Sequence, residues 1–169
     1  WMAKVKSVQK LQRFNTSSTY LLLVNPEKIP HLVFIQNGNY FSLTYKEAEL
    51  NKPFAAYFKL LKRLKKKMLF IELNFQNSKS LEVFKKYVAA NEKDTTCFAP
   101  VKEMLLPQSK SQMVFELIPE LYENQIITAA WQLNLDDDLD SLGDFKLSTY
   151  NKNMIYSYIK ALKEKDANR

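Results

Sequence analysis

The chain has 169 residues, 46% of them hydrophobic and 25% charged, and its formal net charge is +7 at pH 7. This size and apolar content suffice for one buried core, so residues 1–169 are expected to form a single domain. The longest uncharged apolar runs are far shorter than the ~20 residues that cross a bilayer, and no membrane span is expected.

The first elements alternate between helical and extended patterns. Apolar side chains recur at helical spacing over residues 4–14, which predicts a short amphipathic helix. Residues 20–24 are a continuous apolar run that ends at Asn25-Pro26, which predicts a buried strand.

Residues 31–45 predict a two-stranded hairpin with Asn37-Gly38 as its turn, because both central residues of a type I′ turn need positive φ. A two-residue turn fixes the register, which pairs Gln36 with Asn39, Ile35 with Tyr40, Phe34 with Phe41, Val33 with Ser42, Leu32 with Leu43 and His31 with Thr44. Alternation then gives one apolar face, expected to cover a core, that carries Leu32, Phe34, Phe41 and Leu43. The other face is mixed, and it carries His31, the only histidine.

Asn51 is expected to cap a helix that runs to about Lys67. Further predicted elements are a strand at 68–75, helices at 80–91, after Cys97, at 112–123 and at 153–165, and a strand or helix at 126–131. The expected fold class is therefore α+β, in which amphipathic helices pack on a small antiparallel sheet built from the hairpin 31–45 and strands near 20–24 and 68–75.

One side of the predicted 51–67 helix is basic. Its cationic residues are Lys59, Lys62, Arg63 and Lys66. Such a stripe is either a solvated helix face or a docking surface for an acidic protein or nucleic acid. No aromatic residue lies between these cations to stack on bases, so specific nucleic-acid binding is not expected.

Cys97 is the only cysteine, which excludes an internal disulfide and fits a reducing, cytoplasmic compartment. Pro100 is tolerated in the first turn of a helix, so Cys97 is expected at the amino end of one. There the helix dipole would lower the pKa of the thiol and suit a nucleophile. The alternative is that Cys97 is a small buried apolar residue.

The acidic run Asp136 to Asp140 invites a calcium interpretation. It fails the EF-hand pattern, because Ser141 stands where the loop needs glycine and Leu147 stands where it needs glutamate. The chain also lacks a glycine-rich phosphate loop, paired cysteines and an HExxH motif. No metal site and no cofactor are therefore expected.

The segment from His31 to Phe41, with its Asn-Gly turn, resembles the histidine strand of NlpC/P60 and lecithin:retinol acyltransferase-like proteins. In circularly permuted members of these papain-like families, the cysteine follows the histidine and sits at a helix amino terminus, and Thr96-Cys97-Phe98 is similar in order and context. The glycine that those families often have two residues past the histidine is Val33 here, and no asparagine precedes Cys97.

This resemblance implies a cysteine-dependent hydrolase or acyltransferase acting on amide or ester bonds. Cys97 would attack a carbonyl carbon, and His31 would accept and return the proton. Thr44, opposite His31 in the predicted register, and Glu72 on a neighbouring strand are the candidates for orienting the imidazole. The competing hypothesis is a non-enzymatic interaction module that uses the basic helix face.

Overall fold

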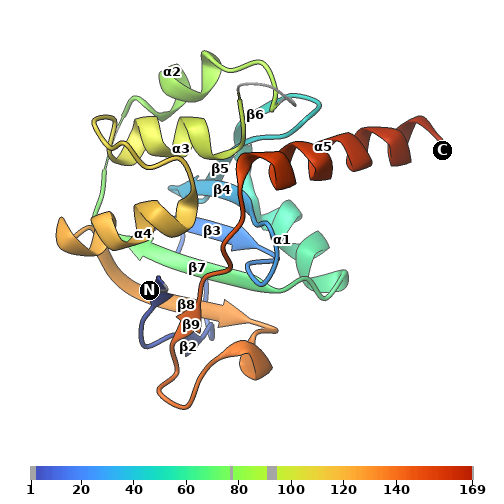
Figure 1. The fold of residues 1–169 in the computed structure, drawn as a ribbon. Helices are drawn as coiled ribbons and strands as arrows, with labels where there is room; N and C mark the ends of the chain where they lie inside the picture. Colours follow the sequence, from blue (N-terminus) through green and yellow to red (C-terminus); the bar gives the residue numbers. More distant parts are fainter. Residues whose placement is uncertain (1–2, 77, 91–94, 169) are drawn as a thin grey trace.

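The computed structural model describes residues 3–76, 78–90 and 95–168, and its largest element is a seven-stranded sheet (Figure 1). Its strands are β2 (Gln9–Lys10), β3 (Thr19–Val24), β4 (His31–Gln36), β5 (Asn39–Leu43), β6 (Ala48–Pro53), β7 (Met68–Leu73) and β8 (Ile127–Leu133). They lie in the order β2-β8-β7-β3-β4-β5-β6, and every neighbouring pair is antiparallel except β2 with β8. A second, two-stranded sheet joins β1 (Lys4–Val5) to β9 (Phe145–Lys146).

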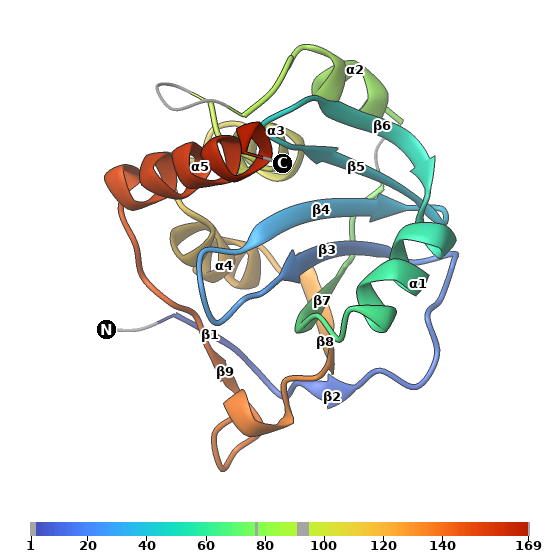
Figure 2. The same ribbon diagram turned by 90° about the vertical axis from the view of Figure 1, so that its right-hand side faces the viewer.

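Helices cover both faces of the large sheet, and because that sheet is mostly antiparallel the α+β class is confirmed. They are α1 (Phe54–Arg63), α2 (Ser80–Lys85), α3 (Phe98–Leu105), α4 (Val114–Glu123) and α5 (Lys152–Ala167), with a short 3-10 turn at Asp136–Asp138. Figures 1 and 2 show α2, α3 and α4 on one side of the sheet, α1 on the other, and α5 beside the end of β4 where that strand begins.

The predicted apolar face is the floor of the main core. Leu32, Phe34 and Phe41 are buried there beneath Phe84 of α2 and Val101 of α3. The fourth predicted member, Leu43, is buried in a neighbouring cluster, where it packs with Ile155 and Ile159 of α5. Alternation therefore predicted correctly which side of the hairpin faces the larger layer of helices.

The face predicted to be mixed is a second core. Val33 and Ile35 are fully buried beneath α1, together with Phe54 and Leu61 of that helix. The ring of Phe14 closes this core, with its centroid 5.1 Å from that of Phe54. A sheet with both faces covered carries apolar side chains on both, so alternation alone did not predict the second layer.

The hairpin forms in the predicted register at four pairs: Gln36 with Asn39, Ile35 with Tyr40, Phe34 with Phe41, and Val33 with Ser42. Asn37 and Gly38 have φ of 53° and 76°, as the predicted turn requires. The Gly38 carbonyl also accepts a hydrogen bond from the backbone N–H of Phe54 at 2.9 Å. The turn thus satisfies one of the N–H groups at the start of α1.

The helix predicted over residues 4–14 is wrong, since that segment forms β1 and β2. Val5, Val8 and Leu11 are buried at three-residue intervals, as in a helix. Ser7, at φ 50°, turns the chain between the two strands, and each strand pairs with a distant one. The same spacing of buried residues therefore arises from a bent, extended chain.

The predicted helix start at Asn51 is also wrong. Asn51 lies in β6 with φ 50°, and α1 begins at Phe54 and ends at Arg63. Strand β6 was not predicted, because its sequence Ala-Glu-Leu-Asn-Lys-Pro is polar and lies at the edge of the sheet. Helix α2 ends at Lys85, and its predicted end at residue 91 lies outside the described residues.

Candidate functional site

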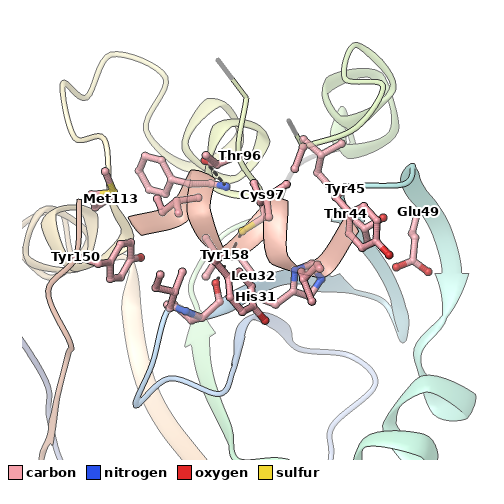
Figure 3. A pocket seen from close by; sticks show the side chains of 18 of the residues that line it. His31, Leu32, Thr44, Tyr45, Glu49, Thr96, Cys97, Met113, Tyr150 and Tyr158 are labelled. Atoms are coloured by element: carbon pink, nitrogen blue, oxygen red, sulfur yellow. Dashed lines mark hydrogen bonds between the residues drawn. The ribbon is translucent and has the colours of Figure 1, made fainter. Parts of the chain in front are cut away.

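A pocket of about 290 Å³ lies where β4 begins, between the start of α3 and the inner side of α5 (Figure 3). Most of its wall is apolar, and the aliphatic side chains in it are Ile29, Leu32, Leu43, Ala90, Met113, Ile155, Ile159 and Leu162. Helix α5 contributes Ile155, Tyr158, Ile159 and Leu162, which follow the i, i+3, i+4, i+7 spacing of one helix face. Asn151 fixes the start of this helix, because its side chain accepts a hydrogen bond from the Met154 N–H at 2.9 Å.

Cys97 lies directly before the first residue of α3, as predicted from Pro100. Its thiol donates a hydrogen bond to the Pro30 carbonyl oxygen, with 3.9 Å between Sγ and O, and the Leu32 N–H bonds to the sulfur. Burial raises the pKa of this thiol to about 11, and the backbone N–H groups of Leu32 and Cys97 only partly oppose that rise. The expectation of a lowered pKa is therefore wrong, because desolvation outweighs the helix start.

His31 lies at the start of β4, half-buried in the wall of the same pocket. Burial lowers the pKa of its imidazole, while the charge of Glu49 acts in the opposite direction. The ring is therefore neutral at pH 7 and keeps one donor and one acceptor nitrogen.

The side chains of Cys97 and His31 lie on different faces of the sheet at the start of β4. Cys97 packs on the core that contains Leu32, whereas His31 alternates with Leu32 and shares the side of Val33, beneath α1. The pocket contacts both residues because it reaches around the end of the hairpin, from Phe98 of α3 to Tyr57 of α1. In Figure 3 the imidazole lies on the side of the pocket nearer Glu49.

Glu49 is the functional candidate that the sequence did not reveal. The Tyr40 hydroxyl donates to its Oε2 at 2.9 Å, the Ser42 hydroxyl donates to its Oε1 at 3.2 Å, and the Lys52 ammonium lies 3.6 Å from Oε2. Burial, followed by the charge of Glu49, raises the pKa of Tyr57 to about 12. Its position could be found only by recognising β6, which pairs Glu49 with Ser42.

Thr44 lines the pocket but its hydroxyl serves the turn after β5. It donates to the Glu47 carbonyl at 3.0 Å and accepts from the backbone N–H groups of Lys46 and Glu47. A hydroxyl has one proton to donate, so Thr44 in this arrangement has none left for the imidazole.

Glu72 lies elsewhere, in a separate pocket with Arg13, Tyr20 and Trp131. In the register of the sheet, His31 is level with Val24, and Glu72 is level with Tyr20 two strands away from β4. Four residues of strand correspond to about 13 Å, and two strand spacings add about 10 Å across the sheet. The structure does not bring Glu72 to His31.

The basic residues of α1 face solvent at Lys59, Lys62 and Arg63, whereas Lys66 follows the helix and is half-buried. The Lys62 ammonium lies 4.2 Å from the centroid of the Phe58 ring. Leu60 and Leu64 are 39% and 53% exposed on the same helix and the turn after it. This surface is therefore both cationic and apolar.

Within residues 3–76, 78–90 and 95–168, no helix combines the length and apolar character needed to cross a membrane. The same residues contain no group of three or more His, Cys, Asp or Glu side chains placed to hold a metal ion. No family model, curated protein or solved structure matches the chain, so the resemblance to papain-like proteins stays a prediction.

Proposed function

We propose that the chain is a non-enzymatic binding module whose pocket beneath α5 holds a small, largely apolar molecule. The observation that carries this proposal is the apolar wall itself, to which β4, β5, α3 and α5 all contribute. Pockets of this size, with few polar groups in an apolar lining, are typical of small-molecule sites.

The polar groups of the pocket suggest how such a ligand would be oriented. A neutral imidazole at His31 can donate to or accept from a hydroxyl or carbonyl group. The Glu49 carboxylate already accepts hydrogen bonds from the Tyr40 and Ser42 hydroxyls and forms an ion pair with Lys52. The ligand that fits best is therefore uncharged, with one polar end near His31 and an apolar body against α5.

The test uses the neutral fluorescent probe N-phenyl-1-naphthylamine. We expect the wild-type protein to raise its fluorescence saturably, and Leu162→Trp, which fills the pocket from a half-buried position, to weaken binding at least ten-fold. Met154→Trp is the matched control, because Met154 is 48% exposed on α5 and does not line the pocket. Equal binding by wild type and Leu162→Trp, or no saturable binding, would overturn the proposal.

A second candidate is the thiol hydrolase or acyltransferase, which is favoured by one specific observation: Cys97 and His31 line the same pocket. In that reaction the sulfur would attack an ester carbonyl, His31 would take the thiol proton and pass it to the leaving alcohol, and water or an acceptor would release the acyl group from sulfur. The raised pKa of Cys97 and its hydrogen bond to Pro30 weigh against it. Saturable hydrolysis of p-nitrophenyl acetate that is lost in both Cys97→Ala and His31→Ala would establish it.

The exposed leucines and cations of α1 and of the turn after it support a further contact of the module, with an acidic protein partner. Leu60 and Leu64 offer apolar area, and Lys59 and Arg63 beside them favour carboxylates. A reducing compartment, the cytoplasm, fits the free thiol of Cys97. We expect an amphipathic peptide rich in glutamate and leucine to bind wild-type protein more tightly than Leu60→Ser/Leu64→Ser. Equal affinity for the two would exclude this contact.

A further inference from the structure

A groove of about 600 Å³ lies at the other end of β4, around the Asn37-Gly38 turn. Its walls come from the start of β3, the end of β6, the segment after β7 and the start of α2. Amide and hydroxyl side chains dominate this lining, among them Thr19, Gln36, Asn39, Asn51 and Gln76. It shares no lining residue with the pocket beneath α5.

The groove differs from the rest of the surface in its charge. A quarter of the chain is charged, yet no charged side chain appears among the described residues that line the groove. An ionic ligand would lose its hydration there without meeting a counter-charge, and an apolar ligand would desolvate amides without replacing their hydrogen bonds. A ligand with many neutral donors and acceptors suits such a wall.

Two hydrogen bonds hold the lining in place. The Asn39 side-chain amide donates to Asn51 Oδ1 at 3.1 Å, and the hydroxyl of the buried Ser80 donates to Gln36 Oε1 at 2.8 Å. A side-chain amide has two N–H groups and an oxygen with two lone pairs, so each bond uses only part of the capacity of Asn39, Asn51 and Gln36. Asn39 and Asn51 are thus held by each other and Gln36 by Ser80, and all three amides keep capacity for a ligand.

We infer that this groove binds a neutral carbohydrate. Each sugar hydroxyl both donates and accepts, which matches side chains that offer both functions over a short span. Leu81, which is 42% exposed, lies in the lining as well and provides an apolar area for the C–H face of a sugar ring. This inference is independent of the function proposed for the pocket beneath α5.

The experiment titrates ¹⁵N-labelled protein with three uncharged disaccharides: maltose, cellobiose and N,N′-diacetylchitobiose. We expect at least one to shift amide resonances at residues 36–39, 51 and 76 saturably at millimolar concentration. Gln76→Leu, on an exposed position after β7, should weaken binding at least ten-fold, and Asn39→Leu should do the same. Asn74→Leu is the matched control, because Asn74 is exposed two residues away and outside the groove.

The inference is overturned if none of the three sugars produces saturable shifts, or if Gln76→Leu and a folded Asn39→Leu bind as tightly as Asn74→Leu. It is equally overturned if the polar peptide Gly-Ser-Asn-Gly saturates the same resonances while the sugars do not. Leu162→Trp should leave sugar binding unchanged, which separates this result from the test of the other pocket.

Discussion

The thiol of Cys97 donates a hydrogen bond to the carbonyl oxygen of Pro30, the residue directly before His31. The backbone N–H of Leu32 also hydrogen-bonds to this sulfur, so the Cys97 side chain links the start of α3 to the beginning of β4. Cys97 is thus placed as a packing residue of the sheet end, and its reactivity should reflect that role.

The first prediction is that iodoacetamide alkylates native Cys97 slowly at pH 7.5. Burial raises the pKa from the ordinary 9.0 to about 11, which reduces the thiolate fraction roughly 100-fold. His31→Ala should leave the rate unchanged, and 6 M guanidinium chloride should restore the rate of a free cysteine. A native thiol that reacts faster than glutathione and slows in His31→Ala would instead support the hydrolase.

The second prediction concerns the imidazole, which gives a single histidine signal in NMR. Its pKa should lie below 6.5, because burial lowers it. Glu49→Gln should lower it further, since the Glu49 charge is what opposes the shift. Glu123→Gln, a change on the exposed end of α4, serves as control and should have no effect. A pKa that rises in Glu49→Gln would contradict the assignment.

The third prediction is that the free energy of unfolding falls as the pH drops below about 6.5. The folded imidazole has a lower pKa than the unfolded one, so the unfolded chain binds more protons in this range and acid favours it. Urea titrations at pH 7 and pH 5 measure the loss, and His31→Gln should remove most of it. The carboxyls of Glu103 and Asp140 have pKa values lowered below their usual 4.5 and 3.8 and titrate outside this window. An identical loss in His31→Gln would show that His31 is not its source.

The fourth prediction compares Gly38 with Gly143, whose φ values are 76° and 77°. A Cβ at Gly38 would meet Thr16 at an ordinary 3.7 Å, and one at Gly143 would meet nothing within 4 Å. The cost of either alanine is therefore one of backbone conformation, about 1 to 2 kcal/mol each. Chemical denaturation measures both, and Gly38→Asn should cost less than Gly38→Ala. A much larger loss at Gly38 alone would indicate steric crowding in the turn.

The fifth prediction is that duplex DNA binds weakly, without sequence preference and with steep salt dependence. Changing Lys59, Lys62, Arg63 and Lys66 to glutamine should reduce the slope of log K against log salt by up to about 4, because each phosphate contact contributes roughly 0.9. Fluorescence anisotropy at several salt concentrations measures this slope. Tight, sequence-selective binding at physiological salt that disappears in the quadruple variant would overturn the prediction.

The sequence predicted the parts of the fold whose signals are local. Asn37-Gly38 determined the register of the hairpin, and Pro100 placed Cys97 before a helix. Parts that depend on distant partners were not predictable in this way: β6 is a polar edge strand, and the three-residue spacing of buried side chains before Leu11 imitates a helix.

The candidate site was predicted in part for the same reason. The pocket brings together His31, Thr44 and Cys97, which the sequence had singled out, but excludes Glu72. Glu49 reaches His31 only through the pairing of β6 with β5, and that pairing has no local sequence signal. The direction of the Cys97 pKa depends on burial, which a helix position alone does not reveal.

The pairing of β1 with β9 and of β2 with β8 has a consequence for synthesis on the ribosome. Gln9 is translated about 120 residues before its partner Trp131, a delay of roughly 6 to 24 s at ordinary elongation rates. Strands β3 to β7, by contrast, pair among themselves except at the outer edge of β7, and all of them are complete once residue 73 has emerged. A nascent chain that has not reached residue 127 therefore presents β7 as an unpaired strand edge. At that stage a chaperone that binds unpaired strands would have its target.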